Sequence, residues 1–216
     1  MLPQEDSYYK LTDKKTLRTL DDIFKLCKGN NCVLIGGMAV ALYSYLSKDI
    51  YYLKRRTKDI DLAAPKEDEQ KIKEILYTRP LEGKITEGNI FGHRGIKIES
   101  RDYVPVSILF REEKIPYKEI KFKYKNRTFK LEVAREEYLL VDKIFTYLRR
   151  GEQKDIEDIE ALVNIMKKKG YDKELLENTF NIYSDRYRKY AEIARDLLNN
   201  FLYSNNGRTF SKGYSR

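Results

Sequence analysis

The first half of the chain alternates short apolar runs with amphipathic segments. Apolar residues at helical spacing predict helices over residues 13–28 and 66–77. Apolar or alternating runs predict strands over residues 32–35, 59–62, 95–100 and 104–110, and a β-hairpin formed by residues 118–124 and 128–133. Residues 83–95 have little periodicity, so we expect a loop or a short edge strand there. This order predicts an α/β (α+β) core with a mixed sheet over residues 12–133.

From Glu136 onward the pattern is helical. Three helices are expected, over residues 138–148, over residues 156–166 with Gly170 closing the helix, and over residues 175–202. We therefore predict an α-helical C-terminal part over residues 134–203. Residues 204–216 are basic and rich in Gly and Ser, which predicts a disordered tail.

A pair of glycines stands where the first strand gives way to a helix. The apolar strand over residues 32–35 stops at Gly36 and Gly37, and a run of small and apolar residues, 38–46, follows. Such a turn leaves backbone N–H groups open to an anion, and the helix dipole adds to the attraction. The pair is therefore a candidate phosphate seat, although a plain tight turn would have the same sequence.

Two aspartates follow on the next predicted strand. Asp59 and Asp61 alternate with Ile60 and Leu62, so both carboxylates are expected on one face. Adjacent carboxylates repel each other unless a cation lies between them, and Mg²⁺ is the usual partner of carboxylate and phosphate oxygens. The alternative is a solvated strand edge.

Together these two features resemble the nucleotidyltransferase superfamily that includes DNA polymerase β. The spacing of about 22 residues matches its Gly-Gly turn and Asp-x-Asp strand, and the stretch R-x-T-x-D-I-D, formed by Arg55, Thr57, Asp59, Ile60 and Asp61, looks like the small nucleotidyltransferases related to AbiEii, the toxins of type IV toxin–antitoxin systems. The resemblance implies catalysis and Mg²⁺ (or Mn²⁺) binding at the two aspartates. It also implies that the two glycines, Arg55 and Thr57 bind a nucleoside triphosphate.

A second stretch of the chain resembles a helix pair of the same family. There a lysine precedes an Arg-x-x-x-Lys-Asp-x-x-Asp run, here Lys143, Arg150, Lys154, Asp155 and Asp158. The resemblance implies that Lys143, Lys154 and Asp155 belong to the nucleotide site, with the basic groups near the phosphates. Ordinary pairing on a helix surface, such as Lys154 with Asp158, is the alternative.

One position departs from the superfamily pattern. A later strand usually supplies a third carboxylate that helps activate the acceptor hydroxyl, but the strand V-P-V-S-I-L-F has Ser107 at that place. A serine hydroxyl cannot replace a carboxylate as base or strong metal ligand. Glu99 or Asp102 could supply the missing catalytic carboxylate, the acceptor could be activated differently, or the chain could bind nucleotide without fast turnover.

Charge and composition add a candidate partner. The net charge of +9 favours a polyanion, and nucleic acid before membrane, because no apolar run is long enough to span a bilayer. A Lys-rich proteome is the compositional alternative. Tyr183, Tyr187 and Tyr190 recur among basic residues and could stack on RNA, although an aromatic helix stripe more often packs in a core.

The remaining residues point to an ordinary intracellular chain. Cys27 and Cys32 have no second pair, and the lone His93 is expected at the surface, so no zinc site is predicted. We expect no signal peptide and a cytoplasmic location with reduced thiols.

The sequence therefore predicts a Mg²⁺-dependent nucleotidyltransferase. The expected reaction moves a nucleoside monophosphate from a nucleoside triphosphate to an acceptor such as RNA or tRNA, and the AbiEii-like resemblance implies growth inhibition and a cognate antitoxin protein. The alternative is a catalytically degenerate nucleotide- or RNA-binding module, the regulatory member of such a system. The choice of nucleotide, the acceptor, the oligomeric state and the toxin or antitoxin role stay open.

Overall fold

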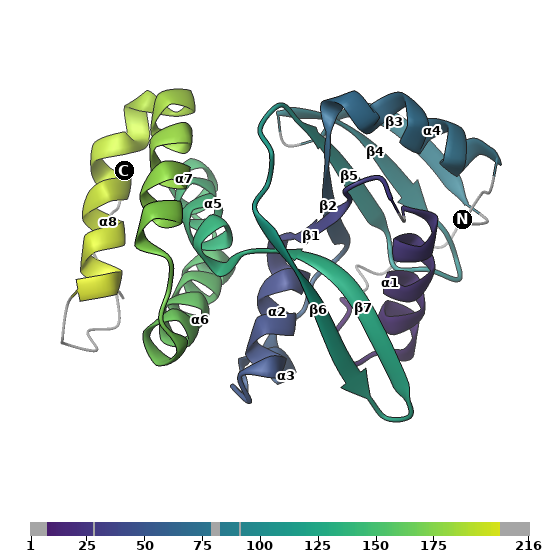
Figure 1. Ribbon diagram of the computed structural model, residues 1–216, viewed down its shortest axis with the longest axis horizontal. Helices are drawn as coiled ribbons and strands as arrows, with labels where there is room; N and C mark the ends of the chain where they lie inside the picture. The colour runs from purple at the N-terminus through teal and green to yellow at the C-terminus, as the bar shows by residue number, and fades with distance from the viewer. Residues whose placement is uncertain (1–7, 28, 79–82, 91, 204–216) are drawn as a thin grey trace.

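A seven-stranded mixed sheet forms the centre of the N-terminal half (Figure 1). The structure is a computed structural model and describes residues 8–27, 29–78, 83–90 and 92–203. The strands are β1 (Val33–Ile35), β2 (Ile60–Pro65), β3 (Lys84–Ile90), β4 (His93–Glu99), β5 (Val106–Arg111), β6 (Tyr117–Tyr124) and β7 (Arg127–Ala134), in the spatial order β3-β4-β5-β2-β1-β7-β6. β1 pairs antiparallel with β2 and parallel with β7, and β2 pairs parallel with β5. The predicted mixed sheet is confirmed.

The register of the three central strands fixes the position of Asp61. In β1–β2 pairing Ile35 lies opposite Asp61, and in β2–β5 pairing Asp61 lies opposite Ser107. Since β1 ends at Ile35, Asp61 lies beside the point where the chain leaves the sheet.

Helices cover the sheet. They are α1 (Lys14–Leu26), α2 (Gly36–Leu46), the single turn α3 (Tyr51–Lys54) and α4 (Glu69–Thr78), which a 3₁₀ turn, η1 (Lys66–Asp68), precedes. α2 is apolar all round and packs against β1 and β2 as well as against α6 (Gln153–Lys169), so it joins the sheet to the helical half. The helices predicted over residues 13–28 and 66–77 are both present, the first as α1 and the second as η1 with α4.

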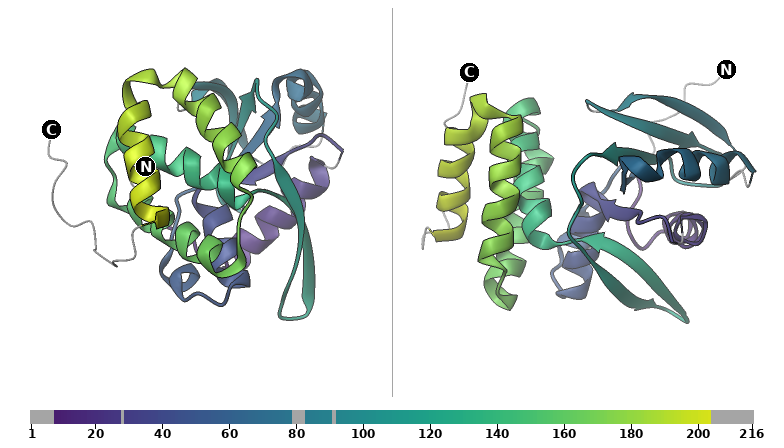
Figure 2. Two further views of the ribbon diagram at one scale, coloured as in Figure 1. Left: turned by 60° about the vertical axis from the view of Figure 1, so that its left-hand side comes forward. Right: turned by 45° about the horizontal axis from the view of Figure 1, so that its top comes forward.

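Only helices follow β7 in the described part of the chain. α5 (Glu136–Arg150), α6, α7 (Lys173–Arg186) and α8 (Ala191–Tyr203) gather beside the sheet, as the two views of Figure 2 show. This confirms the predicted helical C-terminal part. Gly151, at the C-cap of α5 with φ +69°, ends that helix in a left-handed conformation that favours glycine. The assignment of residues 12–133 and 134–203 to separate domains stays a prediction, and the tail 204–216 lies outside the described residues.

One element differs from the predictions. The single helix expected over residues 175–202 is two helices, because a 3₁₀ turn, η2 (Arg188–Tyr190), lets α8 turn back and pack against α5 and α6. Of the loop or short edge strand expected within residues 83–95, the structure has the strand: β3 lies at the edge of the sheet and pairs with β4 from Lys84↔Glu99 to Ile90↔His93. Its side chains are mostly exposed, which explains the missing apolar period.

Two further observations relate to the composition. Cys27 and Cys32 are both free and buried. In the described ranges, no helix combines the length and the apolar character that a bilayer crossing needs.

Candidate active site

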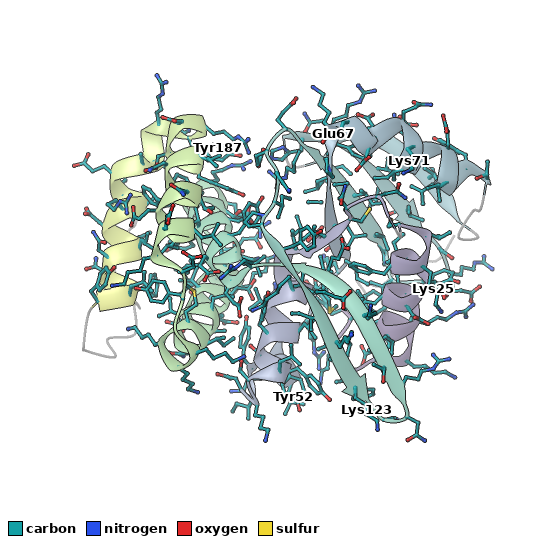
Figure 3. All side chains as sticks on the ribbon, in the orientation of Figure 1. Lys25, Tyr52, Glu67, Lys71, Lys123 and Tyr187 are labelled. Atoms are coloured by element: carbon teal, nitrogen blue, oxygen red, sulfur yellow. The ribbon has the colours of Figure 1, made fainter. Side chains whose placement is uncertain are left out.

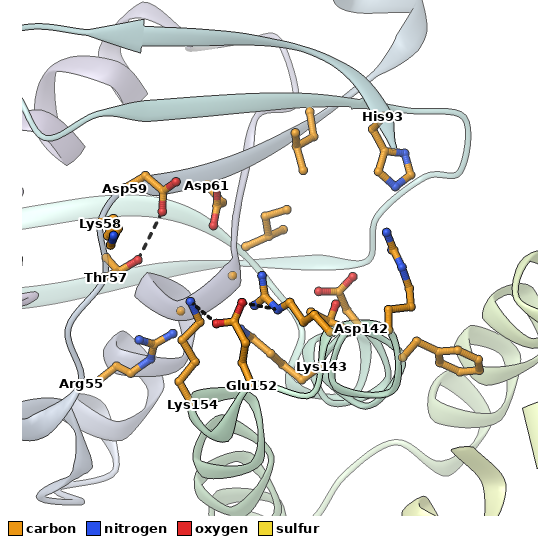
Figure 4. A pocket seen from close by; sticks show the side chains of 18 of the residues that line it. Arg55, Thr57, Lys58, Asp59, Asp61, His93, Asp142, Lys143, Glu152 and Lys154 are labelled. Atoms are coloured by element: carbon orange, nitrogen blue, oxygen red, sulfur yellow. Dashed lines mark hydrogen bonds and ion pairs between the residues drawn. The ribbon is translucent and has the colours of Figure 1, made fainter. Parts of the chain in front are cut away.

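A cavity of about 470 Å³ lies where the sheet meets the C-terminal helices (Figure 4). Its lining comes from the β1–α2 turn, the segment that leads into β2, the adjacent parts of β4 and β5, and helices α5, α6 and α7. This volume suits a nucleotide-sized ligand. Among the described lining residues, lysines and arginines outnumber carboxylates by eight to four, so the cavity favours an anionic occupant.

Because Gly36 has no side chain, the carboxylate of Asp61 can lie against the start of α2. A Cβ at Gly36 would lie 2.5 Å from Asp61 Oδ2, and the backbone there has φ +66°. Both facts favour glycine at this position. The N-terminal end of α2, with Gly36 and Gly37, lines the same cavity, so its backbone N–H groups can meet an anion there.

Asp59 and Asp61 form an acidic pair on one wall of the cavity, as Figure 4 shows. Asp61 Oδ1 is buried and has no hydrogen-bond partner within the described chain. Burial, and next the negative charge of Asp59, raise the pKa of Asp61 to about 7. An unpaired carboxylate in such a place is costly, and a bound cation would remove that cost.

Arg55 explains why position 37 is glycine. A Cβ there would lie 2.1 Å from Arg55 Nη2, so only glycine lets the guanidinium pass over the first turn of α2. Arg55 then donates two hydrogen bonds to Asp158, with Nε 2.7 Å from Oδ1 and Nη2 3.0 Å from Oδ2. Tyr51 donates a third, 2.8 Å from its hydroxyl to Asp158 Oδ1. Arg55 therefore joins the segment before β2 to α6 and lies over the first turn of α2.

Lys143 continues this buried network from α5. Its Nζ lies 2.7 Å from Asp158 Oδ2 and 3.3 Å from Asp155 Oδ1, and Arg150 donates two hydrogen bonds of 2.8 Å to Asp155. Burial opposes ionisation of Asp155, but the hydrogen bonds from Arg150 and the charge of Lys143 outweigh it and lower the pKa of that carboxyl. With Arg55, three cations face two carboxylates, which leaves a surplus positive charge.

The other residues that the family resemblance implied are placed as follows. Thr57 Oγ1 donates to Asp59 Oδ1 at 3.4 Å, and both line the cavity. Lys154 also lines it and pairs with Glu152 at 2.7 Å. Asp155 is fully buried and is not among the lining residues, so it lies behind Lys143 and Arg150 instead of facing a nucleotide directly.

The two candidate replacements for the third carboxylate lie outside the cavity. Glu99 ends β4, is exposed, and pairs with Lys97 at 2.6 Å, while Asp102 is exposed in the following turn. Ser107 is buried beside Asp61 in the sheet, as the register requires. Within the described residues, no three His, Cys, Asp or Glu side chains come together as a metal-binding group. The expectation that Glu99 or Asp102 would reach the metal site therefore has no geometric support.

Sequence reasoning missed the far wall of the cavity. His93, expected at the surface, is half-buried there, and its Nε2 lies 2.6 Å from Arg111 Nη1. Burial, and then the charge of Arg111, lower the pKa of His93 to about 4, so the imidazole is neutral near pH 7. Asp142 on α5 also faces the cavity. No local signal marked it, apart from its place directly before Lys143.

The tyrosines of α7 divide between core and cavity. Tyr183 is buried and Tyr187, which Figure 3 places beside α7, stacks with the guanidinium of Arg149 at 5.0 Å; both line the cavity. Tyr190 packs half-buried against the core. The core interpretation therefore holds for Tyr183, and Tyr187 is the one of the three with a partly exposed ring at the cavity.

A solved structure shares this fold, and two others are similar to it at lower scores. The antibiotic-resistance factor ANT(2'')-Ia has a TM-score of 0.56 at 16% identity, with 85% of this chain and 99% of that chain covered. The lincosamide antibiotic adenylyltransferase LnuA has a TM-score of 0.47 at 17% identity, covering 71% of this chain and 98% of that chain. The Megavirus polyadenylate synthase has a TM-score of 0.47 at 15% identity, with 75% of this chain and 34% of that chain covered.

A family model assigns the chain. No curated protein sequence matches this chain closely enough to indicate a relationship. The model described as nucleotidyl transferase AbiEii toxin, type IV TA system, matches residues 18–215 and so spans both the sheet and the helices that line the cavity. The chain therefore belongs to the AbiEii family of nucleotidyltransferases.

Proposed function

We propose that this protein transfers a nucleoside monophosphate from a nucleoside triphosphate to an acceptor hydroxyl, with Mg²⁺ (or Mn²⁺) held by Asp59 and Asp61. The observation that carries the proposal is the acidic pair, whose Asp61 Oδ1 has no partner among the described residues, inside a cavity with a surplus of positive charge. Family membership supports nucleotide transfer in general. The metal, the acceptor and the biological role are the parts proposed here.

The donor set fits a hard divalent cation. Asp61 Oδ1 lacks a partner among the described residues, and Gly36 leaves the space that the Asp61 carboxylate occupies. Two carboxylates leave most positions of an octahedral Mg²⁺ to phosphate oxygens and water, as is usual where Mg²⁺ accompanies a nucleotide. When bound, the ion would screen the charge that develops on the phosphate oxygens.

Cationic and backbone donors are placed for the rest of the triphosphate. Gly36 and Gly37, in the first turn of α2, line the cavity, and Lys143 and Lys154 line it from the C-terminal helices. In an in-line attack the acceptor oxygen bonds to the α-phosphorus and the bond to pyrophosphate breaks. Lys143, held by two buried carboxylates, is a fixed charge that can steady the departing pyrophosphate.

RNA is the acceptor class that the charge favours, and within it we propose tRNA. The chain carries a net charge of +9, and the cavity carries its own cationic excess. The matched family model names a toxin of type IV systems, which supports a growth-inhibiting role in the cytoplasm and a cognate antitoxin protein as partner.

The test is a transfer assay with labelled ATP, CTP, GTP or UTP, Mg²⁺ and total tRNA. We expect label on RNA with the native protein, at least 100-fold less with Asp61→Asn, and steep weakening of RNA binding as salt increases. Asp102→Asn is the matched control, because Asp102 is an exposed carboxylate outside the cavity. Equal transfer by native and Asp61→Asn proteins would overturn the proposal.

Ser107 favours a second candidate function. A neutral hydroxyl stands beside Asp61 where the superfamily usually has an acid, which supports a module that binds nucleotide or RNA without turnover. Tight Mg²⁺-dependent nucleotide binding with no transfer to any RNA would identify it.

A further inference from the structure

The proposed reaction needs a proton acceptor that the sheet does not supply. The attacking hydroxyl loses a proton as its oxygen bonds to phosphorus, and a positioned base typically accelerates such a step about 10²–10⁴-fold. Ser107 is neutral, and Glu99 and Asp102 are exposed away from the cavity. Any side-chain base must therefore come from another part of the cavity wall.

Two of the candidate bases on that wall are already engaged. Glu152 pairs with Lys154 at 2.7 Å and lies 3.6 Å from Arg150 Nε, and its pKa is lowered, first by the hydrogen bond from Lys154. His93 Nε2 accepts a hydrogen bond of 2.6 Å from Arg111 Nη1. Each of these two groups therefore already has a cationic partner.

Asp142 differs from both. It is partly exposed to the cavity from α5, opposite the Asp59 and Asp61 wall in Figure 4. Its Oδ1 accepts a hydrogen bond of 2.7 Å from the buried hydroxyl of Tyr183, which also lies 3.0 Å from the hydroxyl of Tyr138. Among the described residues Oδ2 has no hydrogen-bond partner, so one oxygen is anchored and the other is available.

Asp142 also acts on Asp61 across the cavity. The negative charge of Asp142 is one of the causes, after burial and Asp59, that raise the pKa of Asp61. Both carboxylates line the same cavity, so a substrate bound at Asp61 lies in the space that Asp142 also faces.

We propose that Asp142 is the general base for the acceptor hydroxyl and so supplies the function of the missing third carboxylate. The inference rests on the proposed transfer reaction. As the hydroxyl oxygen forms its bond to the α-phosphorus, the hydroxyl proton passes to Asp142 Oδ2 and the bond between the α-phosphorus and pyrophosphate breaks. Tyr183 is a positioning residue that holds the carboxylate in place through Oδ1.

The experiment compares native, Asp142→Asn, Asp142→Ala and Tyr183→Phe proteins with labelled nucleotides, Mg²⁺ and total tRNA. Asn keeps the shape and can still accept from Tyr183, so the fold should persist. We expect kcat to fall about 10²–10⁴-fold in both Asp142 variants while the nucleotide dissociation constant changes less than threefold. Added formate, a small carboxylate, should partly restore transfer by Asp142→Ala and should leave Asp61→Asn inactive.

Each outcome decides the inference. Asp142→Asn with kcat within threefold of native, or Asp142→Ala that formate does not rescue, would overturn the role of Asp142 and leave the proposed function standing. A native protein that binds nucleotide yet transfers nothing would overturn the proposed function and this inference with it. Tyr183→Phe should lower kcat by a smaller factor than Asp142→Asn without altering nucleotide affinity.

Discussion

The acidic pair and the buried ion network lie at the same cavity, yet their chemistry is opposite. Asp59 and Asp61 repel each other, and Asp61 Oδ1 has no partner within the described residues. Asp158, by contrast, receives hydrogen bonds from Arg55 and Tyr51 and an ion pair from Lys143. Both groups are carboxylates from family-like motifs, half-buried at Asp59 and Asp61 and fully buried at Asp158. The difference separates a group left open for a ligand from a group that holds the scaffold together.

The largest effect is expected from breaking the network. Asp158→Ala would leave Arg55 and Lys143 with uncompensated buried charge, so the free energy of unfolding should fall by about 3–5 kcal/mol. Urea denaturation measures this free energy of unfolding. Glu157→Gln is the control, because Glu157 is an exposed neighbour of Asp158 on α6. A loss below about 1 kcal/mol would show that the network is not a scaffold.

A smaller loss is expected where the network touches α2. Gly37→Ala places a methyl group 2.1 Å from Arg55 Nη2 and must displace the guanidinium from Asp158, at a cost of about 1–3 kcal/mol. Gly88→Ala is the matched control, because its Cβ would meet open space. If the two variants unfold at the same denaturant concentration, then the position of Arg55 does not require glycine at residue 37.

The acidic pair should respond in the opposite direction. Asp61→Asn removes a buried negative charge next to Asp59, so at pH 8 with chelator present the free energy of unfolding should rise by about 1 kcal/mol. Asp102→Asn, at an exposed position, should stay within about 0.5 kcal/mol of native. Destabilisation of Asp61→Asn would mean that the carboxylate is a structural group like Asp158.

The smallest stability effect is expected at Lys154. Its side chain is 48% exposed and pairs only with the partly exposed Glu152 among the described acids, so Lys154→Ala should change stability by less than about 0.5 kcal/mol. Nucleotide affinity should nevertheless weaken several-fold, because one cation leaves the cavity. Calorimetric titration of the native and variant proteins with nucleotide in the presence of Mg²⁺ measures this affinity. An unchanged nucleotide affinity would mean that Lys154 is an ordinary surface residue.

Local patterns predicted the parts of the site that lie close together in sequence. The strand, the glycine pair and the Asp-x-Asp strand follow from alternation and turn chemistry within residues 32–62, and the structure brings them together through the β1–β2 pairing. At Gly37 the structure adds a reason for glycine that the sequence did not show, because the nearest group to a Cβ there is Arg55. Phosphate binding by the two glycines stays a prediction.

Contacts between distant residues could not be predicted in this way. Arg55 and Asp158 are 103 positions apart, and Tyr183 and Asp142 are 41 apart, so no local period connects them. The break between α7 and α8 was missed for a related reason. The residues around Tyr187 contain no glycine or proline, and packing of α8 against α5 produces the turn.

The most direct measurement of the central claim is nucleotide binding by calorimetry with and without Mg²⁺. Native protein should bind at least one of ATP, CTP, GTP and UTP far more tightly with the metal, and the Asp59→Ala/Asp61→Ala double variant should lose that metal dependence while it remains folded. Metal-dependent binding of unchanged affinity in the double variant would contradict the assignment of the acidic pair as the nucleotide–metal site.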